Sequence, residues 1–433
     1  MRKYLISFIC FFVFFGDAFS EIRNITNLED LKNISEIQES TFVINKPIKI
    51  NEDIYIPKNI TLSFVEDGKL ILDESFKLAI DGKISKTNKQ IFLFTKNTGF
   101  KNLLIKDDYF DVRWFGDPAD EISQIYSSYH GKTMFFDEYV IDTSFSFLYS
   151  NIKAYFNNTL ITGTLHFSDS PADKSKKYIE NINIDGKLKI NGRLGGLYGK
   201  NIFINEVVIA KSENYRPAGV HIYSGIENLR INKLIIEDSI RHYALGIDSH
   251  KISLMPKNIF IKEVIIKDSF VHGAFINGIN IQIDKLIIES FGNIRKSQFI
   301  EQMKKNLSFP LKFKYLDLFE VTPKGLVIGY GTNIKLNKVL IKTKYYSITD
   351  FYNFFRIKKF LVQPAIFFAD FTNQSQINDI EIEIPQSITI TNKIIFFVRD
   401  NIILKIFRKF EKKNYIINNN ILNIWPFEIE KIN

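Results

Sequence analysis

The sequence predicts an all-β fold: a single right-handed parallel β-helix solenoid with short helical insertions and a C-terminal cap. Five nine-residue segments, each opening with Asn and alternating apolar with polar residues, start at intervals of 27, 30, 22 and 53 residues. Short strands at a spacing of about 20–30 residues are typical of one solenoid turn per repeat, whereas propeller blades need about 40 residues. The regular leucine frame of leucine-rich repeats is absent.

The repeat assigns a place to its residues. The five segments are Asn201–Ile209, Asn228–Ile236, Asn258–Ile266, Asn280–Ile288 and Asn333–Ile341. Their isoleucines should stack inside the solenoid. Their opening asparagines should lie at a turn, where stacked amides hydrogen-bond to the coils above and below, which is a structural role. We interpret the interval of 53 residues as two coils plus a helical excursion.

The first twenty residues have the pattern of a secretory signal peptide. Two basic residues precede the apolar run Leu5–Phe15, and the small residues Ala18 and Ser20 stand at the −3 and −1 positions of a cleavage site before Glu21. The alternative is a buried N-terminal strand. We therefore expect a secreted or periplasmic protein, or one at the cell surface. Cys10 is the single cysteine, so a mature chain would rely on burial rather than disulfides.

The remaining chain divides into a lead-in or N-terminal cap (residues 21–40), the solenoid (41–395) and a C-terminal cap (396–433). The lead-in should contain one short helix, Asn27–Ile34. The first coils should be built from the short alternating segments Thr41–Ile44, Ile48–Ile50, Ile54–Ile56, Ile60–Phe64, Lys69–Leu72 and Phe76–Ile80. Helical excursions are expected near 121–129 and 297–307. The basic amphipathic segment Asn401–Lys413 is expected to be a capping helix.

The net charge of the chain indicates which kinds of binding partner it favours. The formal net charge is +9, which favours anionic partners such as acidic glycans or membrane surfaces. The alternative is an ordinary lysine-rich solvated surface. Nucleic acid is not expected after export, and no segment beyond the first twenty residues is long and apolar enough for a stable transmembrane anchor.

Two stretches follow a known pattern: the short coils within Ile54–Phe92, and the run Val112-Arg113-Trp114-Phe115-Gly116-Asp117. On these, residues 41–290 resemble the pectin-lyase-like superfamily, in which a Trp/Phe-Phe-Gly-Ala motif precedes a short helix. The usual acidic run after the Phe-Gly is degraded here, at Gly116–Glu121. The resemblance implies a right-handed β-helix that acts on polysaccharides through its outer face. Tailspike-like members of the group imply a homotrimer.

The candidate site residues cluster between residues 213 and 272. Asp238-Ser239-Ile240-Arg241-His242 aligns with Asp268-Ser269-Phe270-Val271-His272 at the repeat offset of 30, so Asp238 should lie beside Asp268 and His242 beside His272. The candidate catalytic residues are Asp238, Asp268, His242, His272, Arg241 and Asp248. The candidate substrate-binding residues are Glu213, Arg216, His221, Tyr215, Tyr223 and Tyr243.

Several chemistries remain open for this groove. Paired carboxylates with separated pKa values suit a glycoside hydrolase, and a basic residue that removes the C5 proton of a uronate suits a lyase or epimerase. Against these stands a structural interpretation, because Asp-Ser after a strand is a common turn. No metal site and no cofactor are expected. Calcium is the one candidate, and the Asp-rich pattern of calcium-dependent lyases is absent.

The functional hypotheses are therefore two. The chain acts on or binds a polysaccharide, with an acidic glycan favoured, as a lyase, hydrolase or epimerase. Alternatively it is a non-catalytic module that binds glycan, takes part in exopolysaccharide assembly or serves as an adhesin. The absence of the family's recognisable catalytic sets favours the second.

Overall fold

The structure is a computed structural model that falls into two compact units, residues 1–137 and 138–433. It describes residues 21–33, 39–87, 89–95, 102–116, 132–138, 140–142, 144–147, 150–167, 179–196, 198–211, 218–239, 243–249, 251–270, 272–292, 325–342, 366–368, 376–383, 396–398, 414–417 and 420–423. Both units are mainly β, with long runs of parallel pairing, and the fold is consistent with an all-β parallel solenoid.

Unit 1 consists of short strands in parallel sheets. Its elements are β1 (Glu21–Ile25), α2 (Leu28–Lys32), β2 (Ser40–Ile44), β3 (Pro47–Ile50), β4 (Ile54–Ile56), β5 (Ile60–Phe64), β6 (Lys69–Leu72), β7 (Leu78–Ile80), β8 (Lys83–Ile84), β9 (Phe92–Phe94), β10 (Leu103–Ile105), β11 (Tyr109–Asp111), the 3₁₀ helix η3 (Val112–Phe115) and β12 (Thr133–Asp137). The strands predicted between residues 41 and 80 are confirmed. Parallel pairing begins already with β1, inside the predicted lead-in, because β1 pairs with β2.

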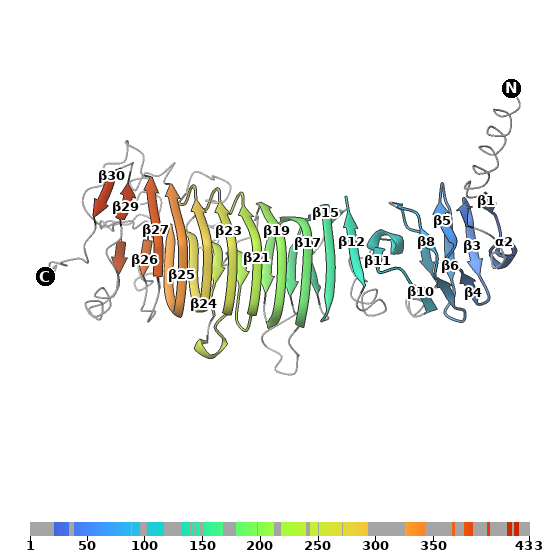
Figure 1. The fold of residues 1–433 in the computed structure, drawn as a ribbon, viewed down its shortest axis with the longest axis horizontal. Coiled ribbons are helices and arrows are strands. Elements are labelled where there is room, and N and C mark those ends of the chain that lie inside the picture. The colour runs from blue at the N-terminus through green and yellow to red at the C-terminus, as the bar shows by residue number, and fades with distance from the viewer. Residues whose placement is uncertain are drawn as a thin grey trace, which may run out of the picture. The chain divides into compact units, whose positions relative to one another are not determined.

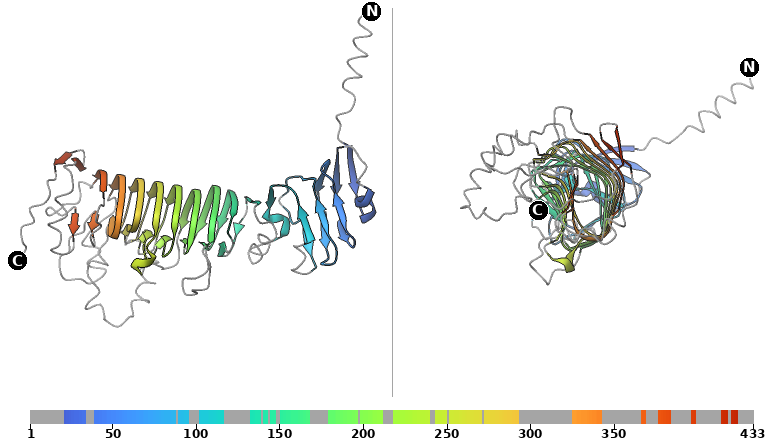
Figure 2. Two further views of the ribbon diagram at one scale, coloured as in Figure 1. Left: turned by 60° about the horizontal axis from the view of Figure 1, so that its bottom comes forward. Right: turned by 90° about the vertical axis from the view of Figure 1, so that its left-hand side faces the viewer.

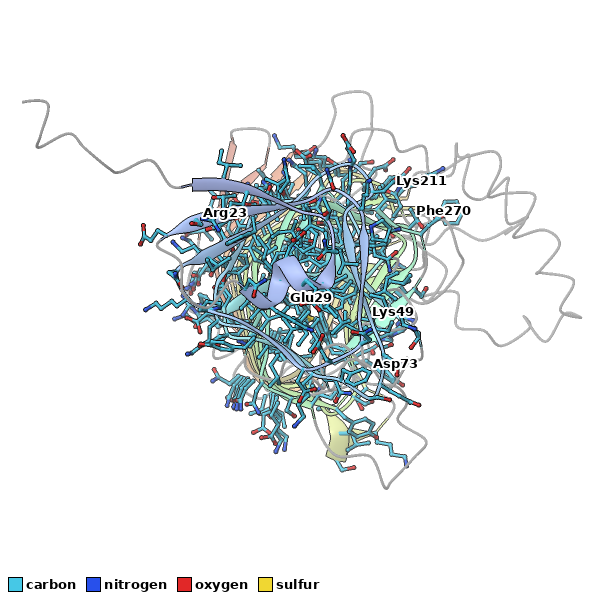
Figure 3. The ribbon with its side chains drawn as sticks, turned by 90° about the vertical axis from the view of Figure 1, so that its right-hand side faces the viewer. Arg23, Glu29, Lys49, Asp73, Lys211 and Phe270 are labelled. Carbon is cyan, nitrogen blue, oxygen red and sulfur yellow. The ribbon has the colours of Figure 1, made fainter. Side chains whose placement is uncertain are left out.

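Helix α2 covers the first strands of unit 1. Asn27 is its N-cap and forms a capping box with Asp30, which explains where the helix begins. The helix packs against β1, β3 and β4, and its Leu31 side chain is completely buried. Figure 3 shows the helix, with Glu29 labelled, in front of the space that these strands enclose. The predicted helix at Asn27–Ile34 is confirmed over Leu28–Lys32, and Ile34 lies outside the described residues.

Unit 2 continues the pattern with longer strands. Its elements are β13 (Val140–Ile141), β14 (Phe145–Phe147), β15 (Ile152–Ile161), β16 (Thr164–Phe167), β17 (Ile179–Asn191), β18 (Arg193–Gly196), β19 (Gly199–Lys211), β20 (Ala218–Ile222), β21 (Glu227–Ile236), β22 (Tyr243–Ile247), the 3₁₀ helix η4 (Ile252–Leu254), β23 (Lys257–Ile266), β24 (His272–Ile288), β25 (Leu326–Lys342), β26 (Ile366–Phe368), β27 (Gln376–Glu383), β28 (Phe396–Val398), β29 (Asn414–Ile417) and β30 (Asn420–Asn423).

Each pass of the chain through unit 2 adds one short and one long strand, and we call such a pass a rung. The short strands β16, β18, β20 and β22 pair in parallel with one another, and so do the long strands β17, β19, β21 and β23. In β24 and β25 the short and the long part are continuous. Figures 1 and 2 show the rungs from β15 to β25 side by side.

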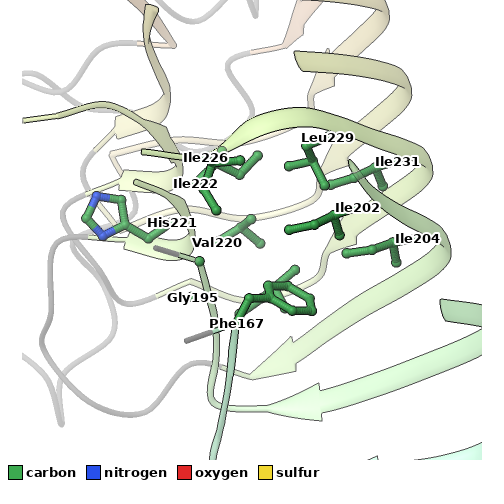
Figure 4. A pocket seen from close by; sticks show the side chains of 12 residues that line it. Phe167, Gly195, Ile202, Ile204, Val220, His221, Ile222, Ile226, Leu229 and Ile231 are labelled. Carbon is green, nitrogen blue, oxygen red and sulfur yellow. The ribbon is translucent and has the colours of Figure 1, made fainter. Parts of the chain in front are cut away.

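The short and long strands enclose a common interior. Phe167, Leu194 and Val220 of the short strands and Ile202, Ile204, Leu229 and Ile231 of the long strands line one small internal gap (Figure 4). The inward isoleucines are almost completely buried. Each such burial contributes on the order of 1.5–3 kcal/mol, which makes this interior the main source of stability in a chain without disulfides.

The predicted register of the five repeat segments is confirmed. Ile202 pairs with Leu229, which pairs with Ile259, followed in turn by Ile281 and Ile334. The opening asparagines therefore occupy one column of the stack. This column extends to two earlier rungs through Asn151 and Asn181.

The asparagines form a hydrogen-bonded ladder, as predicted. From Asn181 onward, each side-chain amide donates to the amide oxygen of the asparagine on the preceding rung at 2.8–3.0 Å. The members are Asn151, Asn181, Asn201, Asn228, Asn258, Asn280 and Asn333. All have positive φ, between 54° and 62°. Asn tolerates this left-handed region better than other residues with a Cβ, so it satisfies the turn and the ladder together.

The interpretation of the 53-residue interval is wrong. Asn333 donates directly to Asn280, and β25 pairs with β24 throughout the repeat. The interval therefore adds one rung rather than two, with the extra residues inserted between β24 and β25. Sequence spacing did not distinguish a long insertion from an additional coil, because both give the same interval.

Parallel pairing continues beyond the repeats. β27 pairs with β25 and β29 with β27, whereas β30 turns back and pairs antiparallel with β29. The signal-peptide pattern at residues 1–20, the expected helices at 121–129, 297–307 and 401–413, and most of residues 396–433 lie outside the described residues. Among those described, no helix is long and apolar enough to cross a membrane.

We predict that Asn258→Ala destabilises the protein by about 2 kcal/mol, because it removes two ladder hydrogen bonds and places Ala in a left-handed turn. Asn258→Gly removes the same bonds but accepts the backbone conformation, so it should be less destabilising. Urea denaturation followed by circular dichroism measures both. If both variants have the same urea midpoint as the wild type, the asparagine ladder does not stabilise the fold.

Candidate functional site

The clearest candidate site lies on the outside of the short strands. In register, His166 pairs with Gly195, Gly195 with His221, His221 with Gly246, and Gly246 with Phe275. The residues on either side of this column, such as Val220 and Ile222, point into the interior, so the column itself faces outward. Figure 4 shows His221 on the opposite side of β20 from Val220 and Ile222.

Glycines precede and follow His221 in the column. Neighbouring strands lie only about 4.8 Å apart, so Gly195 and Gly246 leave room beside the imidazole for side chains from elsewhere on the surface. The His166 ring uses part of this room: a Cβ on Gly195 would lie 2.9 Å from His166 Nδ1. A larger residue at 195 would displace that ring.

His221 bridges an arginine and a carboxylate. Its Nδ1 contacts Arg193 Nη2, and its Nε2 lies 2.6 Å from Asp248 Oδ1. His221 is 6% exposed, whereas the Asp248 side chain keeps 20% of its surface exposed. We call Arg193, His221 and Asp248 the Arg–His–Asp bridge. Arg193 begins β18, His221 lies in β20 and Asp248 follows β22, so three successive rungs contribute.

The chemistry of the bridge determines the tautomer of His221. A guanidinium is only a donor, so Nδ1 accepts from Arg193 and carries no proton. A carboxylate accepts, so Nε2–H donates to Asp248. Both ring nitrogens of the neutral imidazole are therefore occupied. His221 consequently positions the Arg193 and Asp248 side chains and has no ring nitrogen available to remove a proton from a bound molecule.

Aromatic rings lie along the outside of the short strands, one of them against the bridge. The Tyr223 ring lies 4.4 Å from the His221 ring, measured between centroids. One rung further, Tyr243 packs against His272 at 5.1 Å and against Phe275 at 4.8 Å. Tyr243 and Phe275 are half-buried, so parts of both rings reach the surface. The outside of the short strands thus combines charged groups with aromatic faces.

The predicted carboxylate pair occupies equivalent positions on adjacent rungs. Ser239 and Ser269 form a parallel bridge, and the Ser239 amide donates to the Asp268 carbonyl at 3.1 Å. Asp238 and Asp268 therefore lie side by side in the stack, as predicted, and both are half-buried. Their catalytic role stays a prediction.

The expected pairing of His242 with His272 is wrong. The register places Tyr243, not His242, opposite His272, because the turn after Ser269 is one residue shorter than the turn after Ser239. The Ser269 hydroxyl closes this shorter turn on the His272 carbonyl. His272 is only 1% exposed and packs against Tyr243, so its imidazole does not face an open groove.

The described candidates form two groups rather than one groove. Asp238 precedes β22 and Asp248 follows it, and a strand of five residues spans roughly 16 Å. The carboxylate pair therefore lies at one end of β22, and the Arg–His–Asp bridge at the other. The remaining predicted site residues, Glu213, Tyr215, Arg216, Arg241 and His242, lie outside the described residues.

Sequence reasoning missed Arg193, His166 and Phe275, together with the two column glycines. The recognised repeat covers only the long Asn-led segments, whereas Arg193, His166 and Phe275 lie on the short strands. Aligning Arg193–Gly196, Ala218–Ile222 and Tyr243–Ile247 with one another would have found Arg193, because it opens the short strand one rung before His221.

No group of three or more His, Cys, Asp or Glu in the described part of the chain is arranged to hold a metal ion. Comparisons with known proteins add no name to this geometry: no family model, no curated protein and no solved structure matches the chain.

We predict that NMR of ¹⁵N-labelled protein finds His221 as the neutral Nε2–H tautomer at neutral pH. The physical reason is that Arg193 needs an acceptor and Asp248 needs a donor. His221→Gln identifies the resonance among the six histidines. Detection of a proton on Nδ1 would mean that the Arg–His–Asp bridge does not exist in solution.

Proposed function

We propose that this chain is an exported, right-handed parallel β-helix protein that binds an acidic polysaccharide on the outside of its short strands. The observation that carries the proposal is the Arg–His–Asp bridge on an outward-facing column, with the Tyr223 ring against His221 and the half-buried Phe275 in the same column. Sugar-binding surfaces need hydrogen-bonding groups for hydroxyls together with aromatic faces, against which the C–H faces of pyranose rings pack.

Charge supports an acidic ligand. The net charge of +9 attracts polyanions. A guanidinium pairs with carboxylates in a forked geometry, so Arg193 is suited to a uronate or another acidic sugar. The Asp248 carboxylate accepts hydrogen bonds from sugar hydroxyls, while His221 holds one of its oxygens in place. The N-terminal signal-peptide pattern supports export to the compartment where such polymers are found.

The state of His221 favours binding over proton abstraction at this position. A general base must present a free acceptor to the substrate, and both nitrogens of His221 are occupied within the chain. Among the two functional hypotheses, the bridge therefore supports a glycan-binding module more directly than an enzyme.

We predict that Arg193→Ala and Asp248→Ala each weaken binding of an acidic polysaccharide by about 10- to 100-fold, which corresponds to the loss of a hydrogen bond to a charged group. Calorimetric titration against uronate-rich, sulfated and neutral polysaccharides measures the effect. Arg230→Ala is the matched control, because Arg230 lies on the long strands over the Phe260 ring. Equal affinities of Arg193→Ala and Arg230→Ala for the acidic polymers would contradict the proposal.

A second candidate function is cleavage or epimerisation at the carboxylate pair. The observation that favours it is the register that brings Asp238 beside Asp268, because two adjacent carboxyl groups can divide the roles of acid and base.

For this function we predict that Asp238→Ala or Asp268→Ala abolishes product release from an acidic polysaccharide while the circular-dichroism spectrum stays unchanged. Reducing-end release measures hydrolysis, and ultraviolet absorbance of the unsaturated product measures elimination. Asp185→Ala, which alters an outer carboxylate on β17, serves as control. Full turnover in the double variant rejects catalysis by this pair, and binding without any product leaves the binding module as the function.

A further inference from the structure

A row of branched apolar side chains runs along the outside of the long strands. In register, Val208 pairs with Ile235, which pairs with Ile265, followed by Ile287 and Leu340. Their sequence neighbours on both sides point into the interior, so this row faces outward. Val208 is buried and the other four are half-buried. We call these five residues the apolar stripe.

Charged residues line both sides of the stripe. On one side lie Lys233, Glu263 and Lys285, in register on three successive rungs. On the other side lie Glu237, Lys267 and Glu289, the residues that directly follow the paired Ile236, Ile266 and Ile288. These three rungs, the second to the fourth of the stripe, therefore carry opposite charges on its two sides, and the signs invert from one rung to the next. On the fifth rung Lys338 and Lys342 are both basic.

Contacts within the chain explain only part of this pattern. Lys285 pairs with Glu263 at 2.8 Å, and Lys267 pairs with Glu237 at 3.0 Å. Over these three rungs, alternation along each side avoids like charges about 4.8 Å apart, whereas Lys285 lies beside Lys338 of the fifth rung. This alternation does not require that each rung carry opposite charges on the two sides of the stripe. They are separated by four residues of strand, roughly 13 Å, which exceeds the screening length of about 8 Å in physiological salt.

We propose that the apolar stripe is an interface on which a second copy of this chain packs, related by a twofold axis parallel to the direction of stacking. This operation keeps each rung at its level and exchanges the two sides of the stripe. Lys233 then faces Glu237 of the second copy, Glu263 faces Lys267, and Lys285 faces Glu289. An isologous interface requires such self-complementarity, and the opposite charges of these three rungs supply it. On the fifth rung Lys338 faces Lys342, which weakens the contact.

The size of the stripe sets the strength of the interface. Five rungs extend over about 24 Å and the stripe with its charged sides is about 14 Å wide, which is less than the roughly 800 Å² per partner of standard stable interfaces. The dimer is therefore weak and concentration-dependent, and added salt weakens it further. The inference is independent of glycan binding, because the stripe lies on the long strands and the Arg–His–Asp bridge on the short ones.

Sedimentation velocity of the full chain, from about 1 µM to about 1 mM, tests the proposal with a pair of charge variants. Lys233→Glu with Lys285→Glu makes the rungs of Ile235 and Ile287 acidic on both sides, and Glu237→Lys with Glu289→Lys makes them basic on both sides. Each variant alone should stay monomeric, since like charges meet, and an equimolar mixture should dimerise as the wild type does.

A second test places a charge in the stripe. Ile265→Arg should remain monomeric throughout the concentration range, whereas Ile252→Arg, which alters a 76% exposed residue of η4 outside the stripe, should dimerise normally. A wild-type chain that stays monomeric, charge variants that associate alone or fail to associate when mixed, or a trimer that Ile265→Arg leaves intact would each overturn the proposal.

Discussion

Side-chain amides of seven described asparagines hold successive rungs of unit 2 in one register, and the outer surface of the unit follows from that register. Each asparagine adopts the left-handed backbone of its turn, and the side-chain amides donate to the asparagine oxygens of the preceding rungs. Because a slip of one residue would turn every inward isoleucine outward, ladder and interior favour the same alignment. Residues about 20–30 apart in sequence thereby become lateral neighbours. The same alignment holds for Asn280 and Asn333, which are 53 residues apart.

The same register separates two kinds of outer surface. On the short strands, glycines beside His221 admit side chains from neighbouring turns, and the neutral imidazole joins Arg193 to Asp248. On the long strands, charged columns run beside an apolar one. A binding site and a self-association surface can therefore coexist on one stack without sharing residues.

The sequence alone was sufficient for the parts of the fold that repeat. The Asn-led segments, their register and the stacked amides were all predicted, because identical positions recur at every rung. The insertion between β24 and β25 was mistaken for an extra coil, because the spacing of the repeats does not show which residues pair. The candidate site was predicted less well. The pairing of Asp238 with Asp268 followed from the repeat offset, but the His242–His272 pairing failed because a single residue is missing from one turn. Arg193 was missed because the recognised repeat covers only the long strands, and Arg193 lies on a short one.

Disulfide trapping tests the stacking of rungs most directly. Cys10 is the single cysteine. In a Cys10→Ser background, an introduced pair of cysteines therefore has no competing thiol. Arg230 and Phe260 are register partners on adjacent strands, whereas Arg230 and Gln282 lie two rungs apart, about 9.6 Å and beyond the reach of a disulfide. The account predicts that the pair Arg230→Cys with Phe260→Cys forms a disulfide under mild oxidation and that Arg230→Cys with Gln282→Cys does not. Cross-linking of the second pair but not the first would contradict the register and, with it, both proposed surfaces.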